Sequence, residues 1–140
     1  MIEFNGYGLN LNEMLKQMDA DDAYRKSLQK ILNNGTFADY IDDFNGDLTG
    51  LTRPDIEWTV QNGNAMVYLT KSDYEELGHT KAIAVLIDCV AEILWSAYSA
   101  EFDDADDYGI TEDEFFQTLK QWLNGHQRRL FRVIKEIDFD

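Results

Sequence analysis

Apolar and polar residues follow a helical spacing over much of the first third of the chain, with polar residues where helices would begin. The pattern predicts one helix capped by Asn10 or Asn12 and running through Met18, a second capped by Asp19 or Asp21 and running to Leu32, and a third at 37–44 capped by Thr36. Side-chain oxygens at such caps accept hydrogen bonds from the free amides of the first turn. This part of the chain is therefore predicted to be largely helical.

A two-residue alternation replaces the helical spacing after Pro54. Ile56, Trp58 and Val60 alternate with polar residues as far as Asn62-Gly63, and this dipeptide favours a two-residue hairpin turn because both positions need positive φ. Counting outward from the turn pairs Val60 with Ala65, Trp58 with Val67 and Ile56 with Leu69. We therefore predict an antiparallel hairpin at about 55–70 with one apolar cross-strand face.

The segment from Thr80 to Ala100 predicts the longest helix of the chain. Its polar positions fall at spacings of seven, four, four and three residues and form one narrow stripe: Lys81, Asp88, Glu92, Ser96 and Ser99. A helix that is apolar on all sides but one belongs at the centre of a small core. The stripe also argues against a membrane span, because Asp88 and Glu92 interrupt the apolar run.

Two further segments complete the predicted elements. Thr111 can cap a helix that presents Phe115, Leu119 and Trp122 on one side and ends at Asn124-Gly125. Residues 127–139 fit two templates: Leu130, Val133, Ile134 and Ile137 match a helix, whereas Phe131, Val133, Ile137 and Phe139 match a strand. The helix is favoured, because Arg128, Arg129, Arg132, Lys135 and Glu136 would then share the opposite face.

These elements predict a mostly helical α+β fold, with flanking helices and a two-stranded or slightly larger antiparallel sheet packed on the central helix at about 80–100. The length of 140 residues and the absence of a linker or repeat predict one domain over residues 1–140. Hydrophobic residues make up 44% of the chain, so a net charge of −15 belongs to a folded body. The single cysteine, Cys89, and an N-terminus without signal-peptide features predict a cytoplasmic protein.

The negative charge is concentrated in one segment. The 38 residues from Ala82 to Leu119 hold ten carboxylates and no Lys or Arg, and five of the acids lie between Glu101 and Asp107. Five of the twelve basic residues fall between Lys120 and Lys135, which predicts a dipolar molecule. Such a charge disfavours direct binding to nucleic acid or to an anionic membrane, since both attract Lys and Arg. A basic protein surface or a cation is the natural complement.

Asp103 to Glu114 partly resembles the calcium loop of the EF-hand family. With Ile110 at the eighth loop position, Asp103, Asp107, Thr111 and Glu114 fall at positions that supply oxygen ligands in that family. The resemblance implies a calcium-binding protein, but Ala105 replaces a ligand and Tyr108 replaces the glycine of the sharp turn. The alternative is a loop whose acids stabilise the positive end of the next helix.

A second acidic cluster, Asp39, Asp42, Asp43 and Asp47, departs further from that pattern, and catalysis has little support. His79 and His126 lie far from each other and from Cys89, which is predicted to be buried and inert. Asp88 and Glu92 share a helix face as a hydrolase pair could, but they read more simply as a solvated edge. No glycine-rich phosphate loop occurs. We therefore predict no enzymatic activity and no cofactor.

In size and charge the chain resembles small acidic inhibitors of phages and mobile elements, including DNA-mimicking anti-CRISPR and anti-restriction proteins, and the immunity proteins of nuclease toxins. The resemblance implies a stoichiometric inhibitor whose carboxylates imitate phosphates in the groove of a basic nuclease. It rests on no motif. The residues predicted to meet the partner are Glu101, Phe102, Asp103, Asp104, Asp106, Asp107, Tyr108, Glu112 and Asp113, with Asp39, Asp42 and Asp43 as a second group. An acidic structural domain with no partner is the remaining alternative.

Overall fold

The computed structural model describes residues 2–17, 36–45, 55–61, 63–100, 102–104, 106 and 109–137. Its strands are β1 (Ile2–Asn10), β2 (Ile56–Gln61), β3 (Asn64–Leu69) and β4 (Phe131–Ile137). Its helices are α1 (Leu11–Gln17), α3 (Thr36–Asn45), α4 (Lys71–Leu77), α5 (His79–Ser99), α6 (Glu112–Gly125) and α7 (Gln127–Leu130). The fold is α+β, with more helix than strand in the described part of the chain, as the sequence predicted.

The strands form one antiparallel sheet in the order β2-β3-β1-β4. Its β2–β3 hairpin has the predicted register, with Ile56 opposite Leu69, Trp58 opposite Val67 and Val60 opposite Ala65. The apolar face of the hairpin is buried at Ile56, Val67 and Leu69, whereas Trp58 and Val60 of β2 remain 44% and 61% exposed. The prediction of a hairpin is therefore confirmed, within a sheet twice as wide.

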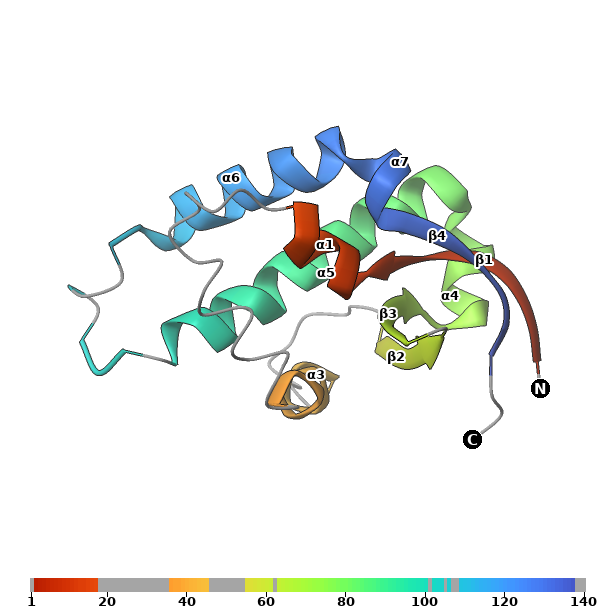
Figure 1. Ribbon diagram of the computed structural model, residues 1–140, viewed down its shortest axis with the longest axis horizontal. Helices are drawn as coiled ribbons and strands as arrows, with labels where there is room; N and C mark the ends of the chain where they lie inside the picture. The colour runs from red at the N-terminus through yellow and green to blue at the C-terminus, as the bar shows by residue number, and fades with distance from the viewer. Residues whose placement is uncertain are drawn as a thin grey trace.

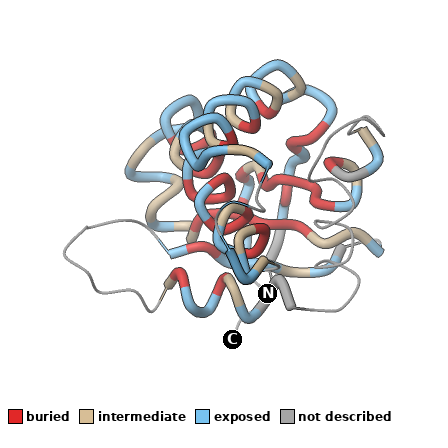
Figure 2. Tube along the Cα trace, turned by 90° about the vertical axis from the view of Figure 1, so that its left-hand side faces the viewer, coloured by how far each residue is buried: buried red, intermediate tan, exposed pale blue. Residues whose placement is uncertain are grey.

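Helix α5 runs diagonally through the molecule, with α6 beside it, α3 near its C-terminal half and the sheet across its N-terminal half (Figure 1). Its exposed positions include Lys81, Asp88, Glu92 and Ser96, and most of its other side chains are buried. Buried segments gather at the centre of the molecule, whereas the periphery is exposed (Figure 2). The prediction of a central apolar helix with one polar stripe is confirmed.

Strand β1 was not predicted. Two of its residues, Gly6 and Gly8, weaken the alternating pattern by which a strand is recognised, and they also allow close packing against its backbone. A Cβ at Gly6 would meet the Phe4 ring at 2.3 Å, and one at Gly8 would meet the Ile134 Cδ1 atom at 2.5 Å. The strand therefore needs glycine so that these two side chains can lie against its backbone. Their small cluster, shared with Met66 and Tyr68, is buried separately from the main core.

The predicted C-terminal helix is wrong beyond Leu130. Only the short helix α7 forms there, and β4 pairs with β1, placing Phe131 opposite Leu9 and Ile134 opposite Gly6. Phe131 packs in the main core, whereas Ile134 belongs to the separate cluster with Phe4, and neighbouring side chains of a strand alternate between faces. Burial on both faces places the buried positions three residues apart, which imitates helical spacing. Val133, which a helix would bury, is 48% exposed.

Two of the predicted helix caps, Asn10 and Thr111, are confirmed. The Asn10 carboxamide oxygen accepts a hydrogen bond from the Glu13 amide at 3.0 Å, so Asn10 is the cap of α1. The Thr111 hydroxyl accepts from the Glu114 amide at 3.2 Å at the start of α6. Helix α3 begins at Thr36 and ends at Asn45, close to the predicted range. The helix predicted to run to Leu32 lies outside the described residues.

Candidate functional site

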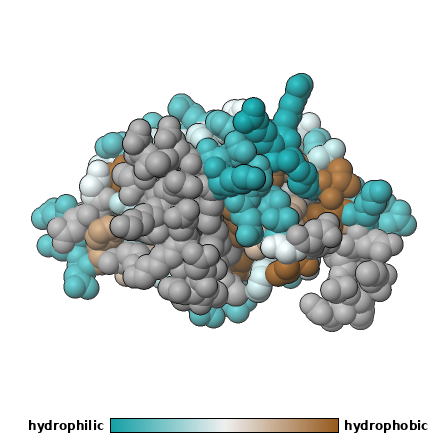
Figure 3. All heavy atoms as spheres, viewed as in Figure 1, coloured by the Kyte–Doolittle hydropathy of each residue, from teal (hydrophilic) through white to brown (hydrophobic). Residues whose placement is uncertain are grey.

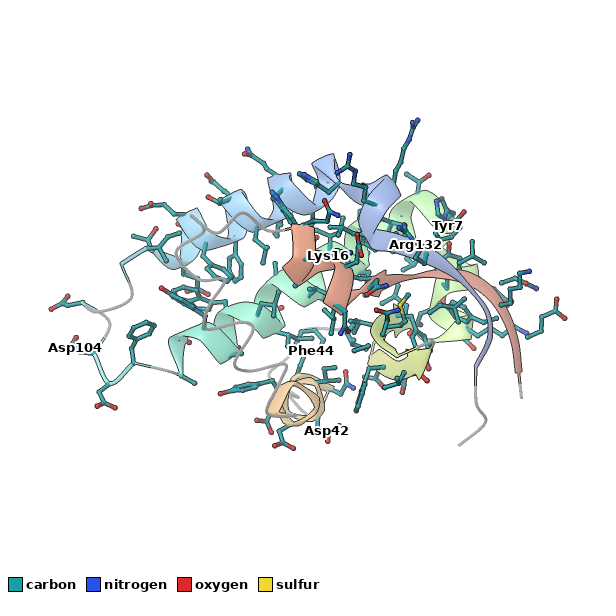
Figure 4. All side chains as sticks on the ribbon, viewed as in Figure 1. Tyr7, Lys16, Asp42, Phe44, Asp104 and Arg132 are labelled. Atoms are coloured by element: carbon teal, nitrogen blue, oxygen red, sulfur yellow. The ribbon has the colours of Figure 1, made fainter. Side chains whose placement is uncertain are left out.

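The acidic segment, meaning residues 101–113 with the first group of predicted partner-binding residues, joins the C-terminal end of α5 to the start of α6 at one extremity of the molecule, called the acidic end below (Figure 1). Five of the predicted partner-binding carboxylates there are described, and all are exposed: Asp103, Asp104, Asp106, Glu112 and Asp113. Asp104 points away from the body of the protein (Figure 4). Glu101, Asp107 and Tyr108 lie outside the described residues.

None of these five carboxylates forms an ion pair within the part of the chain that the structure describes. The ion pairs found there join Lys71 to Glu75 and Lys120 to Asp88, the latter at 3.2 Å. The Asp104 carboxylate accepts a hydrogen bond from the Asp106 amide at 3.1 Å, which fixes the loop locally. The acidic segment therefore presents a concentrated negative charge that the described residues do not neutralise.

An aromatic cluster lies beneath the acidic segment and connects it to the core. The Phe115 ring lies 5.1 Å from the Trp95 ring and 5.5 Å from the Tyr98 ring, and it is fully buried. The half-buried Phe102 ring packs 5.2 Å from Tyr98. Burial raises the pKa of the Tyr98 hydroxyl above its usual value. The exposed acids thus adjoin a buried aromatic cluster, to which the half-buried predicted anchor Phe102 belongs in part.

The second predicted group of acids lies apart from the first. Asp39, Asp42 and Asp43 are exposed on α3, and the ring of Phe44 on the same helix is buried in the core. Figure 4 separates Asp42 on α3 clearly from Asp104 at the extremity of the molecule. The structure therefore brings together the acids of 103–113, whereas the α3 acids form a separate negative patch.

The region that resembles a calcium loop has features of a helix start. The Thr111 hydroxyl donates to the Glu114 carboxylate at 3.1 Å, so this carboxylate, the bidentate ligand in the EF-hand pattern, is engaged in a cap. Gly109 has a φ of 71°, one residue later than the turn glycine of the pattern. Within the described ranges, no group of three or more His, Cys, Asp or Glu side chains could hold a metal ion.

Basic side chains gather toward the opposite extremity, on α7 and β4. Arg128, Arg129, Arg132 and Lys135 are exposed there. Figure 3 shows hydrophilic side chains over α7 and the adjoining end of α6 on the face in view. The Arg129 guanidinium donates to the Gln17 carboxamide oxygen at 3.2 Å, and that of Arg132 donates to the Arg128 carbonyl at 2.9 Å. The dipolar charge distribution predicted from the sequence is therefore visible among the described residues.

The other candidates for chemistry lie in separate places. His126 stacks on Trp122 at 4.6 Å, and its Nδ1 lies 2.8 Å from the Trp122 carbonyl. Cys89 is buried on α5. By length and composition α5 could cross a membrane, and 61% of its most apolar window is buried inside the protein. Such burial is what the core helix of a folded domain shows.

A cluster that was not predicted from the sequence lies at the N-terminal end of α5. The Tyr74 hydroxyl lies 2.6 Å from His79 Nδ1, and the Tyr7 ring packs 4.7 Å from the His79 ring. Burial raises the pKa of Tyr74, although a hydrogen bond to the Tyr7 backbone opposes that shift. These residues come from β1, α4 and α5, so only the tertiary fold reveals the cluster.

Comparison with protein-family models, with curated proteins and with solved structures finds no match to this chain.

Proposed function

We propose that this protein is a stoichiometric inhibitor that occupies the nucleic-acid-binding surface of a basic protein, specifically a defence nuclease of the kind that anti-CRISPR or anti-restriction proteins inhibit. The observation that carries the proposal is the acidic end itself. Asp103, Asp104 and Asp106 are exposed, have no described ion-pair partner and stand on a buried aromatic base. A surface that served solubility alone would not need its charge concentrated at one extremity.

The proposed chemistry is the replacement of phosphates by carboxylates. Lys and Arg side chains that contact a nucleic-acid backbone form charge-assisted hydrogen bonds with carboxylates equally well. Placing the basic residues of α7 and β4 at the far end makes the molecule a dipole. Its field orients the acidic end toward a positive groove and speeds association. A defence nuclease acts in the cytoplasm, and the same compartment is proposed for this chain.

The proposal predicts a basic partner and a strong dependence on salt, which a capture experiment tests. The purified chain is immobilised, exposed to lysates that contain nucleases of bacterial defence and toxin systems, and eluted with a salt gradient. A parallel sample contains EDTA. The expected result is a basic nucleic-acid-binding protein that is released by salt and unaffected by EDTA.

The identity of the captured protein separates two related functions. A defence nuclease supports the inhibitor, whereas a nuclease toxin would identify an immunity protein instead. Capture that disappears with EDTA would contradict the proposal and favour a calcium-dependent function. A column that retains no basic protein would also contradict it and leave an acidic structural domain.

A further inference from the structure

A cavity of about 330 Å³ lies between α7, the first turn of α5 and the sheet. Its described lining consists of Tyr7, His79, Ile83, Gln127, Arg128 and Phe131. The volume is at the lower end of the range for small-molecule pockets, about 300–1,000 Å³. Figure 4 places Tyr7 beside α7, at the extremity opposite Asp104. The cavity is therefore separate from the acidic end.

The charge of this cavity is opposite to that of the protein. The chain has 27 Asp and Glu residues against 12 Lys and Arg, yet the described lining contains one arginine, one histidine and no carboxylate. The Arg128 guanidinium forms no ion pair or hydrogen bond with a described residue. A guanidinium with free donors beside a cavity is suited to bind a carboxylate or phosphate in a bidentate manner.

The polar groups beside Arg128 are held in place with donors available. His79 Nδ1 is occupied by the Tyr74 hydroxyl at 2.6 Å, which leaves Nε2 without a described hydrogen bond. When Tyr74 donates to Nδ1, the neutral imidazole carries its proton on Nε2. The Tyr7 hydroxyl likewise has no hydrogen bond to a described residue. His79, Tyr7 and Arg128 therefore offer three donors around one cavity.

The remaining lining is apolar. Ile83 and Phe131 reach the cavity only with the 4% and 6% of their surface that is exposed, and the half-buried Tyr7 ring, at an angle of 62° to the His79 ring, supplies more accessible apolar surface. Flat apolar groups pack well against such surfaces, and aromatic rings favour this edge-on contact. An inorganic anion alone would make no apolar contact with these residues. A small ligand that combines an anionic group with one aromatic ring would use both halves.

We infer that this cavity binds a small aromatic anion, with its phosphate or carboxylate on Arg128 and His79 and its ring against Ile83 and Phe131. The site is independent of the proposed inhibitory surface, because the two lie at opposite extremities. Phosphate monoesters and carboxylates share the chemistry that Arg128 recognises, and the experiment distinguishes them by using one probe of each kind.

Phenyl phosphate and benzoate are titrated into the ¹⁵N-labelled protein, and amide and side-chain NMR signals are followed. We expect saturable shifts at Tyr7, His79 and Arg128 with at least one of the two probes. Benzylamine, which has the same ring and a positive charge, should produce none. Inorganic phosphate should bind more weakly than phenyl phosphate, because it lacks the ring.

Arg128→Gln and Arg129→Gln form a matched pair of variants. Both remove one positive charge from α7, but the Arg129 guanidinium donates to Gln17 and is not part of the cavity lining. Arg128→Gln should weaken probe binding about tenfold to a hundredfold, and Arg129→Gln should leave it nearly unchanged. Unchanged circular dichroism spectra establish that both variants fold, as expected for exposed side chains.

Several results would overturn the inference. They are the absence of saturable binding by either anion, equal binding of benzylamine, equal loss in the two variants, or equal binding of inorganic phosphate and phenyl phosphate. None of them bears on the acidic end, since capture of a basic partner depends on residues at the opposite extremity.

Discussion

The two ends of α5 differ in charge and in what supports that charge. At its C-terminal end, Asp103 and Asp104 follow the negative end of the helix dipole, which disfavours them, although Glu112 and Asp113 lie at the positive end of α6. At its N-terminal end, Arg128 lines the same cavity as the first turn of α5, whose positive end disfavours a cation in the same way. Asp103 and Asp104 at one end and Arg128 at the other thus have no ion-pair partner among the described residues.

Charge patterning in this molecule is separate from fold stability. The acidic end rests on aromatic rings and the basic end on β1, β4 and Phe131, so apolar contacts stabilise both ends. The exposed charges are therefore free for the two binding roles proposed above, to a basic protein at one end and to a small anion at the other. Changes to the apolar base and changes to the charges should have different consequences.

The largest effect is expected at the aromatic base of the acidic end. Phe115→Ala removes a fully buried ring that contacts Trp95 and Tyr98, and should lower the free energy of unfolding by about 3–5 kcal/mol. Phe116→Ala removes a half-buried ring and should cost less. Urea unfolding followed by tryptophan fluorescence measures both. Equal losses of unfolding free energy in the two variants would contradict the larger contribution assigned to the buried Phe115 ring.

Reversing the charges at the acidic end should change binding and leave folding intact. Asp103, Asp104 and Asp106 replaced together by Lys should weaken binding of the captured protein by about a hundredfold or more. The matched control replaces three exposed acids by Lys: Glu3 on β1, and Glu75 and Glu76 on α4, elements that lie toward the other extremity (Figure 1). Isothermal titration calorimetry measures both variants. An equal loss in the control would mean that net charge alone determines binding.

The sheet at the basic end depends on close approach of β1 and its neighbours. A Cβ at Gly8 would lie 2.5 Å from Ile134 Cδ1 and 3.0 Å from the Val67 carbonyl oxygen, and the latter cannot move aside easily. Gly8→Ala should therefore cost about 1–3 kcal/mol of unfolding free energy. Gly125→Ala, where nothing lies within 4 Å, should be neutral or slightly stabilising. Thermal unfolding compares the two, and a neutral Gly8→Ala would refute the packing of β1.

The N-cap of α6 orders the C-terminal end of the acidic segment. Its removal should lower the free energy of unfolding by less than the changes above. Thr111→Ala removes the hydroxyl that accepts from the Glu114 amide and should cost about 1 kcal/mol. Thr111→Ser keeps the hydroxyl and should restore most of that loss. Amide hydrogen exchange across the first turn of α6 is the readout. Unchanged exchange in Thr111→Ala would show that the cap does not order this turn.

The smallest effect is a loss of stability in alkali, to which one tyrosine at each end contributes. Burial raises the pKa of Tyr98 and Tyr74 above 10.0, so the folded state holds these protons more tightly than the unfolded state. Their stabilisation is complete below pH 10.0 and is lost as the pH rises through the folded values. Urea unfolding at increasing pH should show this decline, and Tyr98→Phe should reduce it. A decline of equal size in Tyr98→Phe would remove Tyr98 as a contributor.

The elements predicted correctly from the sequence are those whose signals are local. The register predicted from the Asn62-Gly63 dipeptide is the one observed, the stripe of Asp88 and Glu92 identifies the exposed side of α5, and Thr111 marks the start of α6. Strands β1 and β4 depend on each other instead. The glycines of β1 weaken its strand signal, and burial of Phe131 and Ile134 on opposite faces gives β4 an apparent helical period.

The candidate sites differ in the same way. The negative charge of the acidic end could be predicted, because its acids lie close together in the sequence. The packing of Phe102 against Tyr98 could not be predicted. The cavity could not be predicted, because Tyr7, His79 and Arg128 are distant in the sequence and meet only when β1 and β4 pair. Because residues 131–137 were predicted as a helix, the cavity beside β4 could not be predicted either.

The most direct test of the proposed function is competition between the protein and nucleic acid. The affinity of the chain for the captured basic protein is measured with and without a short DNA duplex, at one salt concentration. If carboxylates of the acidic end occupy phosphate-binding positions, the duplex should raise the apparent Kd in proportion to its concentration. Simultaneous binding of chain and duplex, with the Kd unchanged, would contradict the proposal that this protein imitates DNA.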